Sequence, residues 1–146
     1  FTGWVVSYPP SVWKTTNSGF NWTEYPMATI YGGTDIQFVN AQTGYCSGGL
    51  NEFFKSTNGG LSWTTIQTSV YDMCGGLNFF NANEGSMISI WGDILKTSNG
   101  GLNWSTYPNS ITKATLYDVK FFNSNTAFTV ASDGSFLKTG HISYCL

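Results

Sequence analysis

Two short sequence words recur along this chain with a period of about 41 residues. The first word is found at Lys14–Trp22 (KTTNSGFNW), Lys55–Trp63 (KSTNGGLSW) and Lys96–Trp104 (KTSNGGLNW). The second word, Phe-x-Asn, begins at Phe38, Phe79 and Phe121, with steps of 41 and 42 residues. A fixed internal period of this length is the signature of repeat architectures. We therefore expect a chain built from copies of one structural unit.

Each copy of the repeat reads as four short β-strands. In the second copy these are expected near Asp35–Val39, Gly44–Ser47 and Glu52–Ser56, with a fourth beginning at Trp63. Runs rich in Phe, Val, Ile and Thr, separated by Gly, Asn, Ser and Pro, are typical of strands and turns, and no window keeps a helical period. Four strands in about 41 residues match one propeller blade. The sequence predicts an all-β fold, a β-propeller or an open segment of one, with about 3.5 four-stranded blades.

Both ends of the chain are expected to fall inside blades. Gly3-Trp4 aligns with Gly44-Tyr45 at the start of a second strand, and Thr139-Gly140 stands where the repeated turn should follow a third strand. The single domain, 1–146, divides into a partial blade at 1–34, blades at 35–75 and 76–117, and a partial blade at 118–146. Since propellers usually close with about four to eight blades and open edges invite pairing, we expect part of a longer chain or an assembly of several chains.

The first word predicts a tight turn between the third and fourth strands. Its Asn can fold its side chain onto the backbone two residues on, its Gly can adopt a positive φ, and its Trp can cover the turn. These structural residues are Asn17, Gly19 and Trp22; Asn58, Gly60 and Trp63; and Asn99, Gly101 and Trp104.

These residues resemble the Asp-box, or BNR, repeat, Ser/Thr-x-Asp-x-Gly-x-x-Trp, of sialidases, sortilin-type receptors, Asp-box glycoside hydrolases and Ycf48-like photosystem assembly factors. Thr15, Ser56 and Thr97 match its first position, and Asn replaces its Asp in all three copies. The Phe-x-Asn and Thr-Gly-Tyr words are most similar to the Ycf48-like subgroup. The resemblance implies a β-propeller whose motif lies on an outer turn, away from the functional face.

The resemblance carries no activity onto individual residues. A sialidase needs an Arg triad, and the Ycf48-like docking face is rich in Arg, whereas this chain has no Arg. An Asp-box glycoside hydrolase needs two facing carboxylates. The candidates are Asp35, Asp72, Asp93, Asp118 and Asp133, and their spacing selects no pair.

Charge and composition exclude several functions. Six Lys against eight acidic residues give a net charge of −2, and charged residues make up only 10% of the chain. Nucleic-acid binding requires a basic patch, which this charge balance does not favour, and no apolar run approaches the roughly 20 residues of a membrane span.

Cys46, Cys74 and Cys145 lack metal-binding spacing and leave two alternatives, one disulfide with a thiol or three buried thiols. No metal or cofactor is expected, and His141 has no triad partner by spacing.

The remaining candidates for binding lie in loops that a propeller presents on one face. They are Tyr8, Tyr31, Tyr71, Asp72, Trp91, Asp93, Lys113, Tyr117 and Asp133. Rings beside polar acceptors suit stacking on a neutral glycan, or the rings only cap the blades. The favoured function is a non-catalytic, secreted or surface-exposed interaction or structural module with a protein partner or self-association. The alternatives are a carbohydrate-binding module and a fragment of an Asp-box glycoside hydrolase.

Overall fold

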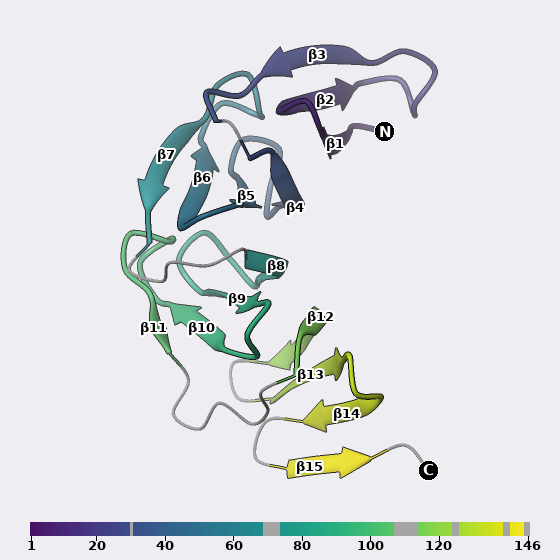
Figure 1. The fold of residues 1–146 in the computed structure, drawn as a ribbon. Helices are drawn as coiled ribbons and strands as arrows, with labels where there is room; N and C mark the ends of the chain where they lie inside the picture. The colour runs from purple at the N-terminus through teal and green to yellow at the C-terminus, as the bar shows by residue number, and fades with distance from the viewer. Residues whose placement is uncertain (30, 69–73, 107–113, 124–125, 139–140, 145–146) are drawn as a thin grey trace.

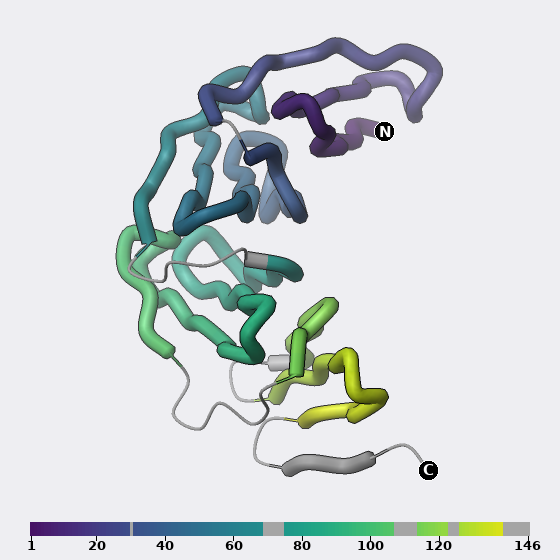
Figure 2. Tube along the Cα trace, viewed as in Figure 1, coloured from purple at the N-terminus to yellow at the C-terminus, as the bar shows by residue number. Residues whose placement is uncertain are grey.

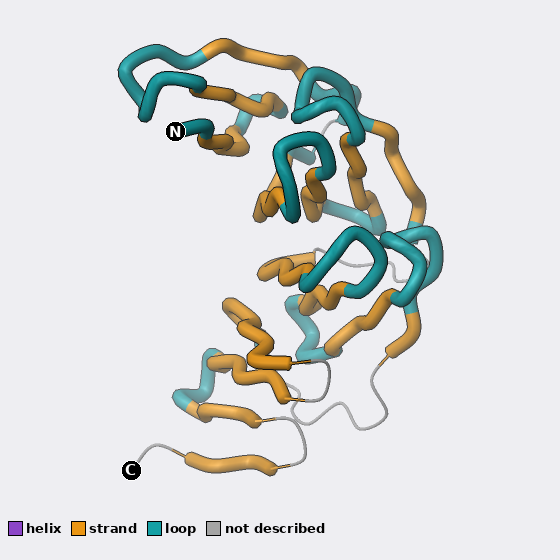
Figure 3. The backbone as a smooth tube through the Cα atoms, turned by 180° about the vertical axis from the view of Figure 1, so that it is seen from behind, coloured by secondary structure: helices purple, strands orange, loops and turns teal. Residues whose placement is uncertain are grey.

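The computed structural model describes residues 1–29, 31–68, 74–106, 114–123, 126–138 and 141–144. These residues form antiparallel sheets joined by turns, and no helix in the described part of the chain could cross a membrane (Figure 3). In chain order, the first sheet holds β1 (Gly3–Ser7), β2 (Ser11–Thr15) and β3 (Thr23–Pro26); the second β4 (Gly33–Phe38), β5 (Gly44–Gly48), β6 (Glu52–Ser56) and β7 (Thr64–Gln67); the third β8 (Cys74–Phe79), β9 (Gly85–Ser89), β10 (Ile94–Thr97) and β11 (Ser105–Thr106); and the fourth β12 (Leu116–Asn123), β13 (Thr126–Ala131), β14 (Ser135–Lys138) and β15 (His141–Tyr144).

The four sheets follow one another along an open arc, and we call them the first to fourth blades (Figures 1 and 2). In Figure 1, β4, β8 and β12 lie toward the concave side of the arc, and β3, β7 and β11 lie on its convex side. In the second, third and fourth blades the strands run from the inner to the outer edge in chain order (Figure 1). The predicted repeat of four-stranded antiparallel units is confirmed.

The fourth blade differs from the sequence expectation. The sequence predicts that this blade stops at its third strand, whereas the structure adds β15, which pairs with β14 through Lys138 opposite His141. Lys55 and Thr64 are the corresponding pair in the second blade, with eight residues between them instead of two. The repeated turn is therefore missing from the fourth blade, but the strand that follows it is present.

Each blade packs face to face against the next, which gives the chain three hydrophobic cores. Every residue of β5 and β9 is buried, because these strands are covered on both faces by neighbouring blades. The core between the first two blades contains Val12, Cys46 and Phe54; the second core contains Tyr45, Phe53, Leu77 and Phe79; and the third contains Ile88, Ile94, Leu116, Val119 and Leu137.

The repeated turn has the same hydrogen bonds in all three copies. In the first, the Gly19 N–H donates to Thr15 Oγ1 at 3.0 Å and the Asn21 N–H donates to Asn17 Oδ1 at 2.9 Å. The sequence predicts a bond from the Asn side chain to the backbone two residues on, and this prediction was wrong. The Asn17 side chain accepts from the N–H four residues on, because the Thr15 hydroxyl already accepts from the Gly19 N–H. The corresponding bonds join Gly60 to Ser56, Ser62 to Asn58, Gly101 to Thr97 and Asn103 to Asn99.

The glycines of this turn take the conformation predicted for them. Gly19, Gly60 and Gly101 have φ of 88°, 86° and 86°. This left-handed region is strained for residues with a Cβ, which explains why glycine recurs there.

The three tryptophans of the turns are not equivalent. Trp63 is half-buried and meets the Phe38 ring edge-on, with centroids 5.8 Å apart, and Trp104 meets Phe53 in the same way at 5.0 Å. Trp22 is 39% exposed and donates its Nε1–H to the Gly19 carbonyl oxygen at 3.1 Å. The Trp63–Phe38 contact lies within the second blade, but Trp63 also packs against the core between the first two blades, and Trp104 reaches Phe53 of the preceding blade.

Trp63→Ala should lower the free energy of unfolding by about 3 kcal/mol, because it removes a packed ring from the first interface between blades. Trp22→Ala, at the same motif position but more exposed, should cost less than about 1 kcal/mol. Urea denaturation of both variants measures the difference. Equal losses would contradict the packing described for these rings.

Candidate functional site

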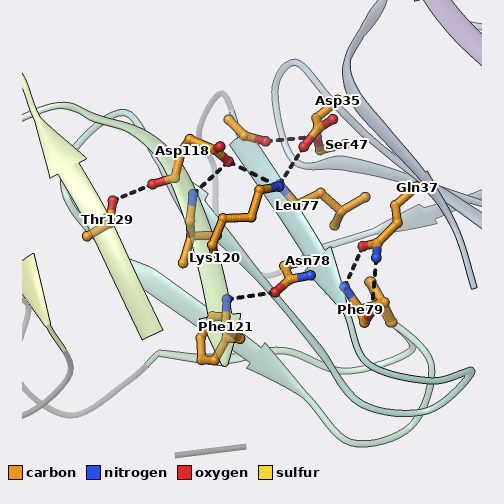
Figure 4. Close-up of polar contacts among 12 residues, drawn as sticks. Asp35, Gln37, Ser47, Leu77, Asn78, Phe79, Asp118, Lys120, Phe121 and Thr129 are labelled. Atoms are coloured by element: carbon orange, nitrogen blue, oxygen red, sulfur yellow. Dashed lines mark hydrogen bonds and ion pairs between the residues drawn. The ribbon is translucent and has the colours of Figure 1, made fainter. Parts of the chain in front are cut away.

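Polar side chains on the inner strands bridge one blade to the next (Figure 4). Asp35 on β4 accepts through Oδ2 from the Leu77 N–H on β8 at 2.8 Å. Gln37 makes two bonds with Phe79: the Phe79 N–H donates to Oε1 at 2.6 Å, and Nε2 donates to the Phe79 carbonyl oxygen at 3.0 Å. Because β8 lies at the edge of its sheet, these side chains satisfy backbone groups that no strand pairs.

Fewer inner-strand hydrogen bonds join the third and fourth blades than join the second and third among the described residues. The Phe121 N–H donates to Asn78 Oδ1 at 2.8 Å, but Gly76 occupies the repeat position of Asp35 and has no side chain to contribute. On β12 the same two positions hold Asp118 and Lys120. Their Oδ1 and Nζ atoms lie 3.8 Å apart, and their side chains are 51% and 66% exposed. This part of the inner edge therefore presents charged groups to solvent.

A hollow lies at the beginning of the inner strands, where Gly75 and Gly76 interrupt the line of side chains. Its volume is about 380 Å³. It is lined by Thr34, Asp35, Gly75, Gly76, Tyr117, Asp118 and Lys120. A Cβ on Gly76 would lie 2.6 Å from Asp118 Oδ1, so glycine both opens the hollow and lets β12 approach β8.

The hollow is lined by hydrogen-bond donors and acceptors and by the aromatic ring of Tyr117. Tyr117 is 63% exposed, and the Lys120 ammonium can donate to a carbonyl or carboxylate oxygen. Asp35 accepts from the Ile36 and Leu77 N–H groups, each at 2.8 Å, which fixes its carboxylate against the strands. The arrangement can therefore orient a polar chain laid across the three inner strands.

The sequence-predicted loop residues are spread over several blades. Tyr117 lies within β12 and lines the hollow, so its expected position in a loop was wrong. Tyr31 and Trp91 lie in loops and are 45% and 68% exposed, and neither lines the hollow. Tyr71, Asp72 and Lys113 lie outside the described residues.

The two predicted loop carboxylates belong to turns. Asp133 Oδ1 accepts from the Ser135 N–H at 2.9 Å and from Ser135 Oγ at 2.6 Å, and these bonds hold the pKa of Asp133 below its usual value. The Asp93 N–H donates to Ser89 Oγ at 3.2 Å, and the Asp93 carbonyl oxygen accepts from the Ser89 N–H at 2.9 Å. Both residues shape the connections in which they lie.

Cys46 is a buried thiol in the first core, and burial, with a smaller contribution from Asp35, raises its pKa. The side chains of Cys74 and His141 and all of Cys145 lie outside the description. Among the described residues no three His, Cys, Asp or Glu side chains gather in a group that could hold a metal ion.

Sequence reasoning missed the bridging roles of Gln37 and Asn78 and the place of Lys120 beside the hollow. A usable signal was present: residues 35, 76 and 118 lie three residues before the Phe-x-Asn words, and residues 37, 78 and 120 lie one residue before them. Polar residues that alternate with buried Leu77 and Phe79 mark the exposed edge of an inner strand.

Gln37→Ala should destabilise the chain by about 2 kcal/mol, because it leaves the Phe79 N–H and carbonyl without the side chain that now bonds both. Gln42→Ala, at an exposed position of the same blade, should cost less than about 0.5 kcal/mol. Thermal and urea unfolding measure both changes. A Gln37→Ala variant as stable as Gln42→Ala would show that the bridge between the inner strands adds nothing.

No known protein-family model matches this sequence, and no curated protein matches it either. Similarity is found among solved structures. A YCF48 bound to a D1 peptide superposes with a TM-score of 0.67 at 20% identity, covering 77% of this chain and 37% of that one. YCF48 from Cyanidioschyzon merolae gives a TM-score of 0.68 at 12% identity over 99% of this chain and 55% of the other.

A GH74 enzyme from Niastella koreensis is also similar, with a TM-score of 0.73 at 18% identity over 91% of this chain and 25% of that enzyme. This chain thus spans between about a quarter and just over half of these proteins. The fold is that of a β-propeller in an open form, and the predicted likeness to Ycf48-like and Asp-box propellers is confirmed at the level of the fold.

Proposed function

We propose that this chain is a non-catalytic interaction module that binds an extended segment of a partner protein across the hollow at the start of the inner strands. The observation that carries the proposal is the grouping of Tyr117, Asp118 and Lys120 around the Gly75–Gly76 gap. An extended peptide offers alternating N–H and carbonyl groups, which Asp118 can accept from and Lys120 can donate to. Similarity to a YCF48 bound to a D1 peptide supports a peptide as ligand.

The bonds of Asp35 favour binding over hydrolysis. Glycoside hydrolysis needs one carboxyl group to protonate the leaving oxygen and another to act on the opposite side of the bond. Asp35 is the carboxylate that shares the hollow with Asp118, and both of its oxygens already accept backbone N–H groups. Its role in the proposal is to hold β4 against β8.

A peptide selected from a phage-displayed random library on the immobilised chain tests this function. Tyr117→Ala and Lys120→Gln should each weaken binding of that peptide roughly tenfold, about 1.4 kcal/mol, when affinity is measured by fluorescence anisotropy. Both side chains are exposed, so these variants should fold normally. Trp91→Ala is the matched control, since it removes an exposed ring from a loop outside the hollow.

Peptide binding that survives both hollow variants but is lost in Trp91→Ala would contradict the proposed site.

A second candidate, neutral-glycan binding, is favoured by the exposure of Tyr8 and Trp91, at 80% and 68%. Retention on an affinity gel of a neutral polysaccharide that is abolished by Tyr8→Ala or Trp91→Ala would establish that function instead.

We further propose that the protein is secreted or exposed at the cell surface. The support is compositional: 10% charged residues and a surface that must therefore be largely neutral and polar. Protease treatment of intact cells, with immunodetection of the chain in cells and medium, tests the location. A chain confined to protected intracellular fractions would overturn it.

A further inference from the structure

The third blade packs on the second through two matched surfaces, a trailing face and a leading face. Tyr45 and Phe53 of the second blade are fully buried and form what we call its trailing face. Phe79 and Trp104 belong to the leading face of the third blade, which covers them. Phe79 stacks on Tyr45 at 3.7 Å between ring centroids, and Trp104 meets Phe53 edge-on at 5.0 Å. Two neighbouring blades therefore join a trailing face to a leading face.

The fourth blade has the same kind of trailing face, but its rings are accessible to solvent. Phe128 is the counterpart of Tyr45, because each pairs with the lysine of its own third strand. In the same register Phe136 corresponds to Phe53, and the Phe128 and Phe136 rings stack with centroids 5.3 Å apart. Both rings are half-buried, and Val130, which pairs with Phe136, is 44% exposed. This surface matches the one on which the third blade packs inside the arc.

The first blade exposes a leading face. Val5 occupies the position of Met87, which is fully buried in the core between the second and third blades. Val5 is 48% exposed, and Trp13, opposite it on β2, is half-buried. Trp22, the counterpart of Trp104, is 39% exposed. The first blade therefore presents to solvent residues whose counterparts join blades elsewhere in the chain.

These two exposed faces stand at opposite ends of the open arc (Figures 1 and 2). A contact between a leading face and a trailing face joins two different surfaces, and such head-to-tail contacts can close into a ring. Two copies of four blades would supply eight blades, and propellers usually close with about four to eight. The number of blades is therefore suitable for a ring of two copies.

We propose that this chain forms a closed head-to-tail dimer, in which the first blade of each copy packs on the fourth blade of the other. The occupant of each exposed face follows from the chain itself, which packs the equivalent residues against one another in its interior. Trp22 of one copy should meet Phe136 of the second copy edge-on, as Trp104 meets Phe53 within the chain. The first blade has three described strands and supplies no ring at the position of Phe79, so its contact rests on β1, β2 and Trp22.

Sedimentation velocity over a series of protein concentrations tests the dimer. We expect a reversible equilibrium between monomer and dimer. Val5→Lys and Val130→Lys should each weaken association at least tenfold, because each places an ammonium group in an apolar contact. Both side chains are exposed within one copy, so these variants should fold normally. Leu61→Lys is the matched control, since it changes a 51% exposed apolar residue in the turn of the second blade and should leave association unchanged.

Mixing the two variants tests whether the contact is head-to-tail. The Val5→Lys chain keeps an intact trailing face, and the Val130→Lys chain keeps an intact leading face. An equimolar mixture should therefore associate through one intact contact, more strongly than either variant alone and less strongly than the unmodified chain. No gain on mixing would overturn the proposal. Association that survives in Val5→Lys and is lost in Val130→Lys would also overturn it, because the fourth blades would then pack on each other.

The size of the assembly decides between the remaining occupants. A folded chain that stays monomeric up to millimolar concentration would overturn the dimer and leave further repeats of a longer polypeptide as the occupants of both faces. Open chains of more than two copies would overturn the closed ring.

The dimer and the proposed function can fail separately. The contact between copies uses β13 and β14 of the fourth blade, whereas the hollow is lined from β4, β8 and β12 and the residues next to them. Tyr117→Ala should therefore weaken the selected peptide without changing the dimerisation constant, and Val5→Lys should do the reverse. A dimer that Tyr117→Ala weakens as much as Val5→Lys does would contradict the proposed contact.

Discussion

The fold depends on rings that stack from one blade onto the next. Trp4 stacks on Phe38 and Tyr45 stacks on Phe79, each with centroids 3.7 Å apart and planes within about 10° of parallel. The glycine that begins the second strand leaves room for the Phe ring of its own blade: a Cβ on Gly44 would overlap the Phe38 ring, and a Cβ on Gly85 would lie 2.6 Å from the Phe79 ring. At the first two interfaces, the ring that follows this glycine in one blade therefore stacks on the Phe of the Phe-x-Asn word in the next blade.

The third blade departs from the repeat at two positions. At the third interface Ser86 replaces the ring, and Ser86 lines a pocket of about 310 Å³ together with Lys96 and Trp104. On the inner strands Gly76 replaces an aspartate, and the gap becomes a hollow beside Tyr117. In both places a side chain that joins blades elsewhere is absent, and beside Gly76 the charged groups of Asp118 and Lys120 face solvent.

The sequence was sufficient for the local part of the structure. A constant period, alternating strands and glycines with positive φ are set within one repeat, and Gly19, Gly60 and Gly101 adopt the predicted conformation. The bridges from Asp35 and Gln37 join residues 42 apart, so only a comparison of equivalent repeat positions, and not the local sequence, points to them. Likewise β15 does not follow from the sequence pattern, because the turn that precedes the fourth strand in the other blades is missing there. Of the six candidate loop positions that the structure describes, three, Asp93, Tyr117 and Asp133, have turn or strand roles.

A double-mutant cycle on Tyr45 and Phe79, with each residue changed to leucine, tests the stacking of blades most directly. Leucine keeps both positions apolar, so the cycle isolates the ring-to-ring interaction from burial. The account predicts a favourable coupling of about 1 kcal/mol in the free energy of unfolding. If the losses of unfolding free energy in the two single variants add up to the loss in the double variant within about 0.3 kcal/mol, the rings act independently. Stacking would then not hold successive blades together.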